Sequence, residues 1–136
     1  MSLDIQEESG FKYVQEGEGE GESLILLHGL FGALSNFHDV IDHFKSRFTV
    51  IVPLLPIYDL PVLDTNVKSL SKFLKKFMDF KGIEQANLLG NSLGGHVALV
   101  FSKRNPERNP EDKSGKEIRK KNPQHEFGRD ILVREI

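Results

Sequence analysis

Short apolar runs alternate with helical patterns between residues 23 and 102, and this alternation restricts the folds that the chain can adopt. Residues 23–27 and 48–52 are apolar or β-branched runs, which are typical of buried strands. Residues 37–44 carry apolar side chains at helical spacing, the stripe of an amphipathic helix. Strands that alternate with helices favour a parallel sheet with the helices on its faces. We therefore predict an α/β fold.

The remaining elements follow from the same patterns. Val67 begins a long stripe of apolar residues at helical spacing, and Gly82 is the expected stop of that helix. A mostly apolar helix is expected over residues 93–103. Shorter strands are expected at residues 86–89 and, as an edge strand, at residues 11–14.

Composition excludes several classes of protein. Hydrophobic residues make up 38% of the 136 residues. Counting the 12 glycines as well brings the apolar share near that of typical globular domains, so a packed core is expected. The net charge of −2 argues against nucleic-acid binding, which leaves a basic excess. Because there is no cysteine, disulfides, thiolate zinc sites and cysteine nucleophiles are excluded. Neither a signal peptide nor an apolar run of membrane-spanning length is evident. We therefore expect a soluble, cytoplasmic protein with no nucleic-acid or membrane partner.

The composition changes near residue 105. Residues 103–128 contain only two apolar side chains, Ile118 and Phe127, and more basic than acidic residues. A segment so poor in apolar groups cannot offset its ordering entropy by burial. We expect residues 1–105 to form the folded part and residues 106–136 a polar, basic tail that is disordered or loosely helical. The apolar triplet at residues 131–133 is expected to be a stray strand or a docking element.

One motif carries chemistry, the segment Gly90-Asn91-Ser92-Leu93-Gly94-Gly95 between an expected strand and an expected helix. G-x-S-x-G in this context is typical of a nucleophile elbow, in which a tight turn raises the serine hydroxyl above the sheet. The spacing of the glycines has a steric cause. In such a turn the chain before Ser92 passes so close to the chain after it that side chains at positions 90 and 94 would collide, and glycine occupies both positions. Gly95 allows the helix to pack closely on the sheet. A helix N-terminus also favours negative charge at Ser92.

A second glycine-containing turn, His28-Gly29-Leu30-Phe31-Gly32, follows the strand at residues 23–27. Its two glycines let the chain turn so that a backbone N–H points inward, and His28 is expected to brace the turn by hydrogen bonds. The N–H groups of Leu30 and Leu93 would together form an oxyanion hole. Two such donors contribute strongly to catalysis, since the loss of one typically lowers the rate by about 10²–10³-fold.

Residues from about 23 to 105 resemble the N-terminal half of an α/β-hydrolase, with strands, His-Gly turn, elbow and helices in the matching order. The resemblance implies that Ser92 is the nucleophile and that the N–H groups of Leu30 and Leu93 bind the oxyanion. It implies a serine hydrolase acting on a small carboxylic ester or related acyl substrate, without metal or cofactor. The segment from Gly90 to His96 also resembles hydrolases that cleave carbon–carbon bonds in ring-fission products, which is an alternative reaction.

The part of the chain after Ser92 departs from the family pattern. In this fold the triad acid and histidine follow the serine on later strand ends, and 44 residues follow Ser92 here. Because one strand–helix–strand unit takes roughly 30 or more residues, we expect a parallel sheet that is truncated or rearranged after Asn105. His125, Asp112 and Asp130 follow the serine, but no expected strand aims them at it. A non-catalytic fragment that serves as a binding module is therefore a further hypothesis.

His96 lies four residues after Ser92 on the expected helix and is expected to be a buried packing residue. The strand at residues 86–89 would have an open edge if the sheet ended there, and unpaired edges favour association. We therefore expect the chain to be marginally stable or to self-associate.

Overall fold

The structure is a computed structural model that describes residues 4–17, 22–29, 37–57, 66–91, 93–108 and 131–134. Its strands are β1 (Gln6–Glu8), β2 (Phe11–Glu16), β3 (Ser23–Leu27), β4 (Thr49–Pro53), β5 (Asn87–Asn91) and β6 (Ile131–Arg134). Its helices are α1 (His38–Phe44), α2 (Val67–Lys81), α3 (Leu93–Arg104) and the 3₁₀ turn η2 (Pro106–Arg108). The predicted strands and helices between residues 23 and 104 are confirmed, with small shifts at their ends.

The described strands form one mixed sheet in the order β1-β2-β4-β3-β5-β6. β4, β3, β5 and β6 run parallel, as predicted for the central part of the sheet. β2 is antiparallel to β4, and β1 is antiparallel to β2. The strand expected at residues 11–14 is confirmed as β2, but its expected position at the edge of the sheet is wrong, because β1 pairs with it there.

A two-residue turn explains the extra strand. Ser9 and Gly10 join β1 to β2 and both have positive φ, 51° and 84°. Two-residue hairpin loops with positive φ at both positions match the twist of the strands that they join. β1 itself is polar and exposed, so its residues carry no apolar signal that would predict a strand.

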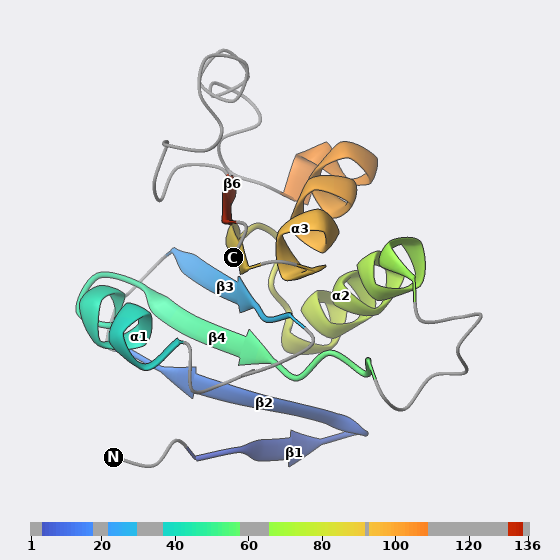
Figure 1. Cartoon of the computed structure of the whole chain (residues 1–136). Coiled ribbons are helices and arrows are strands. Elements are labelled where there is room, and N and C mark those ends of the chain that lie inside the picture. The colour runs from blue at the N-terminus through green and yellow to red at the C-terminus, as the bar shows by residue number, and fades with distance from the viewer. Residues whose placement is uncertain are drawn as a thin grey trace.

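The core lies on both faces of the sheet, because successive strand side chains point to opposite faces. Ile25 and Leu27 of β3 pack with α2 and α3 in one apolar cluster. Leu24 and Leu26 pack with α1 in a second cluster. Figure 1 shows α2 and α3 on one side of the sheet and α1 on the other. Burial of both faces explains why β3 and β4 read as continuous apolar runs.

β6 pairs in parallel with β5, with residues 131–134 opposite residues 88–91. Figure 1 shows this strand beside α3. The expected open edge of β5 is therefore wrong, since the apolar triplet at residues 131–133 occupies it. The predicted self-association, which rested partly on that edge, stays a prediction. Residues 109–130, which make up most of the predicted tail, lie outside the described residues.

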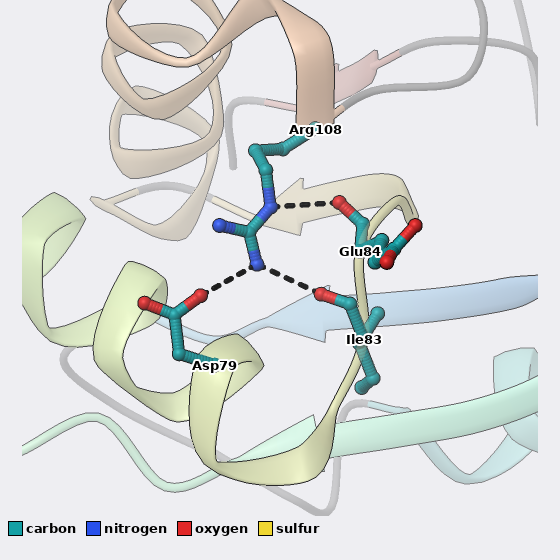
Figure 2. A network of polar contacts seen from close by, with 4 residues as sticks. All are labelled: Asp79, Ile83, Glu84 and Arg108. Atoms are coloured by element: carbon teal, nitrogen blue, oxygen red, sulfur yellow. Dashed lines mark hydrogen bonds and ion pairs between the residues drawn. The ribbon is translucent and has the colours of Figure 1, made fainter.

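Arg108 fastens the chain after α3 to the loop that precedes β5 (Figure 2). Its guanidinium donates to the carbonyl oxygens of Glu84 (2.7 Å) and Ile83 (2.8 Å) and forms an ion pair with Asp79 (2.9 Å). The carbonyl oxygen of Arg108 in turn accepts a hydrogen bond from the N–H of Ala86 (2.9 Å). Charge-assisted hydrogen bonds of this kind are among the stronger polar contacts. They hold η2 and the end of α3 against the amino end of β5.

Removing the Phe77 ring tests the first apolar cluster. Phe77 is fully buried on α2 and packs edge-on against Phe11 and Tyr13 of β2. We expect Phe77→Ala to lower the free energy of unfolding by about 3–5 kcal/mol, through lost burial and the cavity left behind. Leu99→Ala on α3, whose side chain is 42% exposed, is the control and should change it by less than about 1 kcal/mol. Urea unfolding followed by circular dichroism measures both, and equal effects would contradict the described packing.

Candidate active site

Two turns meet at the carboxyl edge of the sheet. β3 and β5 are parallel neighbours, and Leu27 lies opposite Gly90 in their register. The residues that follow these strands therefore leave the sheet side by side. They are His28 and Gly29 after β3, and Leu93 and Gly94, the start of α3, after β5.

Gly94 is the point at which the two turns touch. A Cβ built on Gly94 would overlap the carbonyl group of Leu27 and lie 2.8 Å from the carbonyl oxygen of His28. Those atoms belong to the backbone and cannot swing aside. The first turn of α3 therefore rests directly on the end of β3, and only a glycine permits this.

Gly90 is required for a second close approach. A Cβ at this position would overlap the carbonyl group of Gly94 and lie 2.5 Å from the Cα of Gly95. β5 and the first turn of α3 thus fold back on one another within a few residues. The three glycines of the motif all lie in this crowded region, where a side chain at Gly90 or Gly94 would collide with backbone atoms.

The structure describes part of the predicted site. Leu93 begins α3, and its side chain packs against the apolar cluster under α2. The first N–H groups of a helix have no partner within that helix, so the start of α3 offers donors to an anion. Ser92 and Leu30, the predicted nucleophile and second oxyanion donor, lie outside the described residues.

His28 is buried, with 5% of its surface exposed, and both of its ring nitrogens have a partner. The backbone N–H of Leu55 donates to Nε2 of His28 (2.9 Å). Nδ1 therefore carries the proton, and it donates to the carbonyl oxygen of Gly29 (2.8 Å). Burial lowers the pKa of His28 below its ordinary value of 6.5, and the Gly29 contact opposes this in part. The ring is neutral and braces the turn after β3.

Leu55 is a partner that sequence reasoning missed. It lies just after β4 and contributes a backbone N–H, which leaves no signal in its side chain. The sequence likewise indicates no role for Asn91, which precedes the predicted nucleophile. Its Oδ1 is buried and has no hydrogen-bond partner within the described structure.

The expectation of a buried His96 is wrong. α3 buries Gly95, Val97, Ala98 and Phe101, and His96 projects from the other face of the helix into solvent. A difference of one position turns a helical side chain by about 100°, which is enough to exchange core for solvent. His125, Asp112 and Asp130 lie outside the described residues.

A surface hollow of about 340 Å³ lies away from this edge. It is lined by residues around Arg108, namely Asp79, Glu84, Gln85, Glu107 and Arg108. These residues surround the loop before β5 and therefore lie at the opposite end of that strand from Asn91.

Across the described ranges no group of three or more His, Cys, Asp or Glu residues could hold a metal ion. No helix in those ranges is long and apolar enough to cross a membrane.

Comparison with known proteins agrees with this arrangement. The family model described as alpha/beta hydrolase fold matches residues 22–108. A hydrolase of 2-hydroxy-6-oxononadienedioate and 2-hydroxy-6-oxononatrienedioate from Comamonas testosteroni is 38% identical over an alignment of 112 positions, and the match covers 74% of this chain. The chain belongs to the alpha/beta hydrolase family.

Solved structures are also similar to this chain, among them the following two. MGS-MChE2, an alpha/beta hydrolase enzyme from a sediment metagenome of the Mar Chica lagoon, superposes with a TM-score of 0.73 at 46% identity over 78% of this chain. A marine microorganism esterase superposes with a TM-score of 0.64 at 28% identity over 79% of it. The chain spans 48% of MGS-MChE2, 40% of the esterase and 38% of the Comamonas hydrolase.

The contact at Gly94 leads to a stability prediction. Gly94→Ala places a methyl group on the backbone of Leu27 and His28, so that the start of α3 must move away from β3. We expect a loss of at least about 1–3 kcal/mol in the free energy of unfolding, the usual cost of overpacking. His96→Ala, on the exposed face of the same helical turn, is the matched control and should change it by less than about 0.5 kcal/mol. Equal unfolding midpoints for the two variants would contradict the close approach.

The buried neutral imidazole leads to a pH prediction. Because the pKa of His28 is lower in the folded than in the unfolded chain, the unfolded chain takes up the proton first as the pH falls. Stability therefore declines from about pH 7 down to the folded-state pKa, at no more than about 1.4 kcal/mol per pH unit from this one group. His28→Asn should weaken this decline, whereas exposed His43→Asn should retain it. Identical pH profiles of the free energy of unfolding for His28→Asn and the unaltered chain would contradict the assignment.

Proposed function

We propose that this chain carries the nucleophile and oxyanion hole of a serine hydrolase that acts on a carboxylic ester or related acyl substrate. The observation that supports it best is the contact of Gly94 with the end of β3. That contact brings His28, two residues before Leu30, next to Gly94, two residues after Ser92. A nucleophile and two backbone donors can then surround one carbonyl group.

In this proposal Ser92 Oγ attacks the carbonyl carbon of the substrate and transfers its proton to a base. The carbonyl oxygen becomes an oxyanion and accepts hydrogen bonds from the N–H groups of Leu30 and Leu93. Collapse of the adduct expels the alcohol, which takes up the proton, and leaves an acyl-serine that water hydrolyses. Donors held in place before the reaction stabilise the oxyanion without reorganisation.

The base of this reaction is proposed to come from residues beyond the described part of the chain. In this fold the acid and the histidine follow the nucleophile along the sequence. His96 follows Ser92 but projects into solvent from α3. His28 is neutral and buried, and both of its nitrogens are occupied, so it is not available to accept the proton of Ser92.

A carbon–carbon bond hydrolase is the second candidate, and the 38% identity to the Comamonas hydrolase favours it. The substrates in that relative's name carry a 6-oxo group, so both candidate reactions begin with a carbonyl carbon. The same oxyanion donors would serve either reaction. Side-by-side assays with p-nitrophenyl esters of short acids and with a 2-hydroxy-6-oxo-dienoate separate the two, because the bond cleaved differs.

Labelling with a fluorophosphonate tests the nucleophile assignment. We expect the 136-residue chain to be labelled, with peptide mapping placing the adduct on Ser92, and Ser92→Ala to abolish it. Ser46→Ala, an exposed serine after α1, is the control and should label like the unaltered chain. A chain that is folded but not labelled at Ser92 would contradict the proposal and favour a non-catalytic binding module.

The hydrolysis rates of the unaltered chain and of Ser92→Ala test whether a catalytic base is present. A site that lacks part of its triad can still exceed the uncatalysed rate by about 10³–10⁴ through its oxyanion hole and substrate binding. Weak turnover therefore does not show that a base is present. A further loss of about two or more decades in Ser92→Ala would show it, because Ser92 and its base act as a unit.

A further inference from the structure

His28 connects two segments that are distant in the sequence. Its imidazole accepts a hydrogen bond from the N–H of Leu55, after β4, and donates one to the carbonyl oxygen of Gly29, after β3. These two contacts, called the His28 bridge, lie at the carboxyl edge of two adjacent parallel strands. The ring is buried, so water does not compete for either contact.

The direction of the bridge is fixed by the donor at one end. The N–H of Leu55 can only donate, so Nε2 of His28 must present a lone pair to it. A neutral imidazole has one protonated nitrogen, and the proton must then reside on Nδ1. With the other tautomer, two hydrogens would face each other at Leu55 and two lone pairs at Gly29. The Leu55 contact thus selects the tautomer that can hold the Gly29 carbonyl.

Holding a carbonyl also orients the N–H of the same peptide group. A trans peptide is planar, and its N–H points away from its C=O. The peptide group that contains the Gly29 carbonyl ends in the N–H of Leu30. Fixing the carbonyl oxygen on the His28 side therefore directs that N–H to the opposite side.

We infer that His28 is a positioning residue for the oxyanion hole, and that its bridge holds the Gly29–Leu30 peptide with the N–H of Leu30 directed at the substrate oxygen. This inference rests on the proposed function, in which that N–H is an oxyanion donor. Both ring nitrogens of His28 are occupied by backbone groups, so in this inference His28 acts on the substrate only indirectly. Its effect passes through one rigid peptide group, anchored by the backbone after β4.

Two substitutions separate the ends of the bridge. The amide nitrogen of asparagine can take the place of Nδ1, so His28→Asn can keep the donor to Gly29 while losing the contact with Leu55. The amide oxygen of glutamine can reach the place of Nε2, so His28→Gln can keep the contact with Leu55 while losing the donor. A purely structural role predicts similar effects of both variants.

The catalytic readout is the rate of fluorophosphonate labelling at Ser92 in the full chain. We expect His28→Gln to slow it by about 10- to 100-fold, which is below the 10²–10³ cost of removing an oxyanion donor. His28→Asn should stay within about 3-fold of the unaltered chain, and His43→Gln on α1 should not change the rate. Equal slowing of His28→Asn and His28→Gln would overturn the inference.

A second readout does not depend on catalysis. In the unaltered chain, imidazole ¹⁵N shifts should identify His28 as the neutral tautomer protonated at Nδ1. The ¹H–¹⁵N heteronuclear NOE of the Leu30 amide should be that of ordered backbone in the unaltered chain and in His28→Asn, and should fall in His28→Gln. A proton on Nε2, or equal order in both variants, would overturn the bridge. If Ser92 is not labelled but these signatures appear, the proposed function fails and the bridge stands.

Discussion

The contact between Gly94 and the end of β3 is the constraint on which the rest of the site depends. It brings the backbone of a helix onto the carbonyl group of a strand with no side chain between them. The parallel register of β3 and β5 supplies the alignment, and the closeness of Gly90 to the first turn of α3 supplies the sharp reversal. A displacement of α3 by the width of one methyl group would separate the two turns that the proposed chemistry requires together.

The two apolar clusters make that contact rigid. Leu24 to Leu27 of β3 alternate between the cluster under α1 and the cluster under α2 and α3, so β3 is clamped from both sides. Arg108 fastens the far end of α3 to the loop before β5 (Figure 2). The helix is thereby held at both ends, at Gly94 by close backbone contact and at Arg108 by polar contacts. A preorganised oxyanion hole needs a frame of this stiffness.

Much of this arrangement could be predicted from the sequence, because local patterns specify it. Three patterns each have one straightforward structural interpretation. They are the apolar runs at β3 and β4, the apolar stripe of α2, and the spacing of Gly90 and Gly94. What the sequence did not reveal depends on distant backbone or on one helical position. β1 is polar and is joined to β2 by a tight turn. β6 pairs with β5 although the two strands are far apart in the sequence, and the partner of His28 is the backbone N–H of Leu55. His96 lies one position away from the buried face of α3.

The most direct test of this account is an NMR distance between the two turns in the unaltered chain. The α-hydrogen of Gly94 that occupies the place of a side chain points at the Leu27 carbonyl group, whose carbon is bonded to the amide nitrogen of His28. Standard backbone dimensions then put this hydrogen within about 5 Å of the His28 amide proton. We expect a clear NOE between them in uniformly ¹³C,¹⁵N-labelled protein. A folded chain in which Gly94 shows NOEs only to its own helix and to β5, and none to Leu27 or His28, would contradict the account.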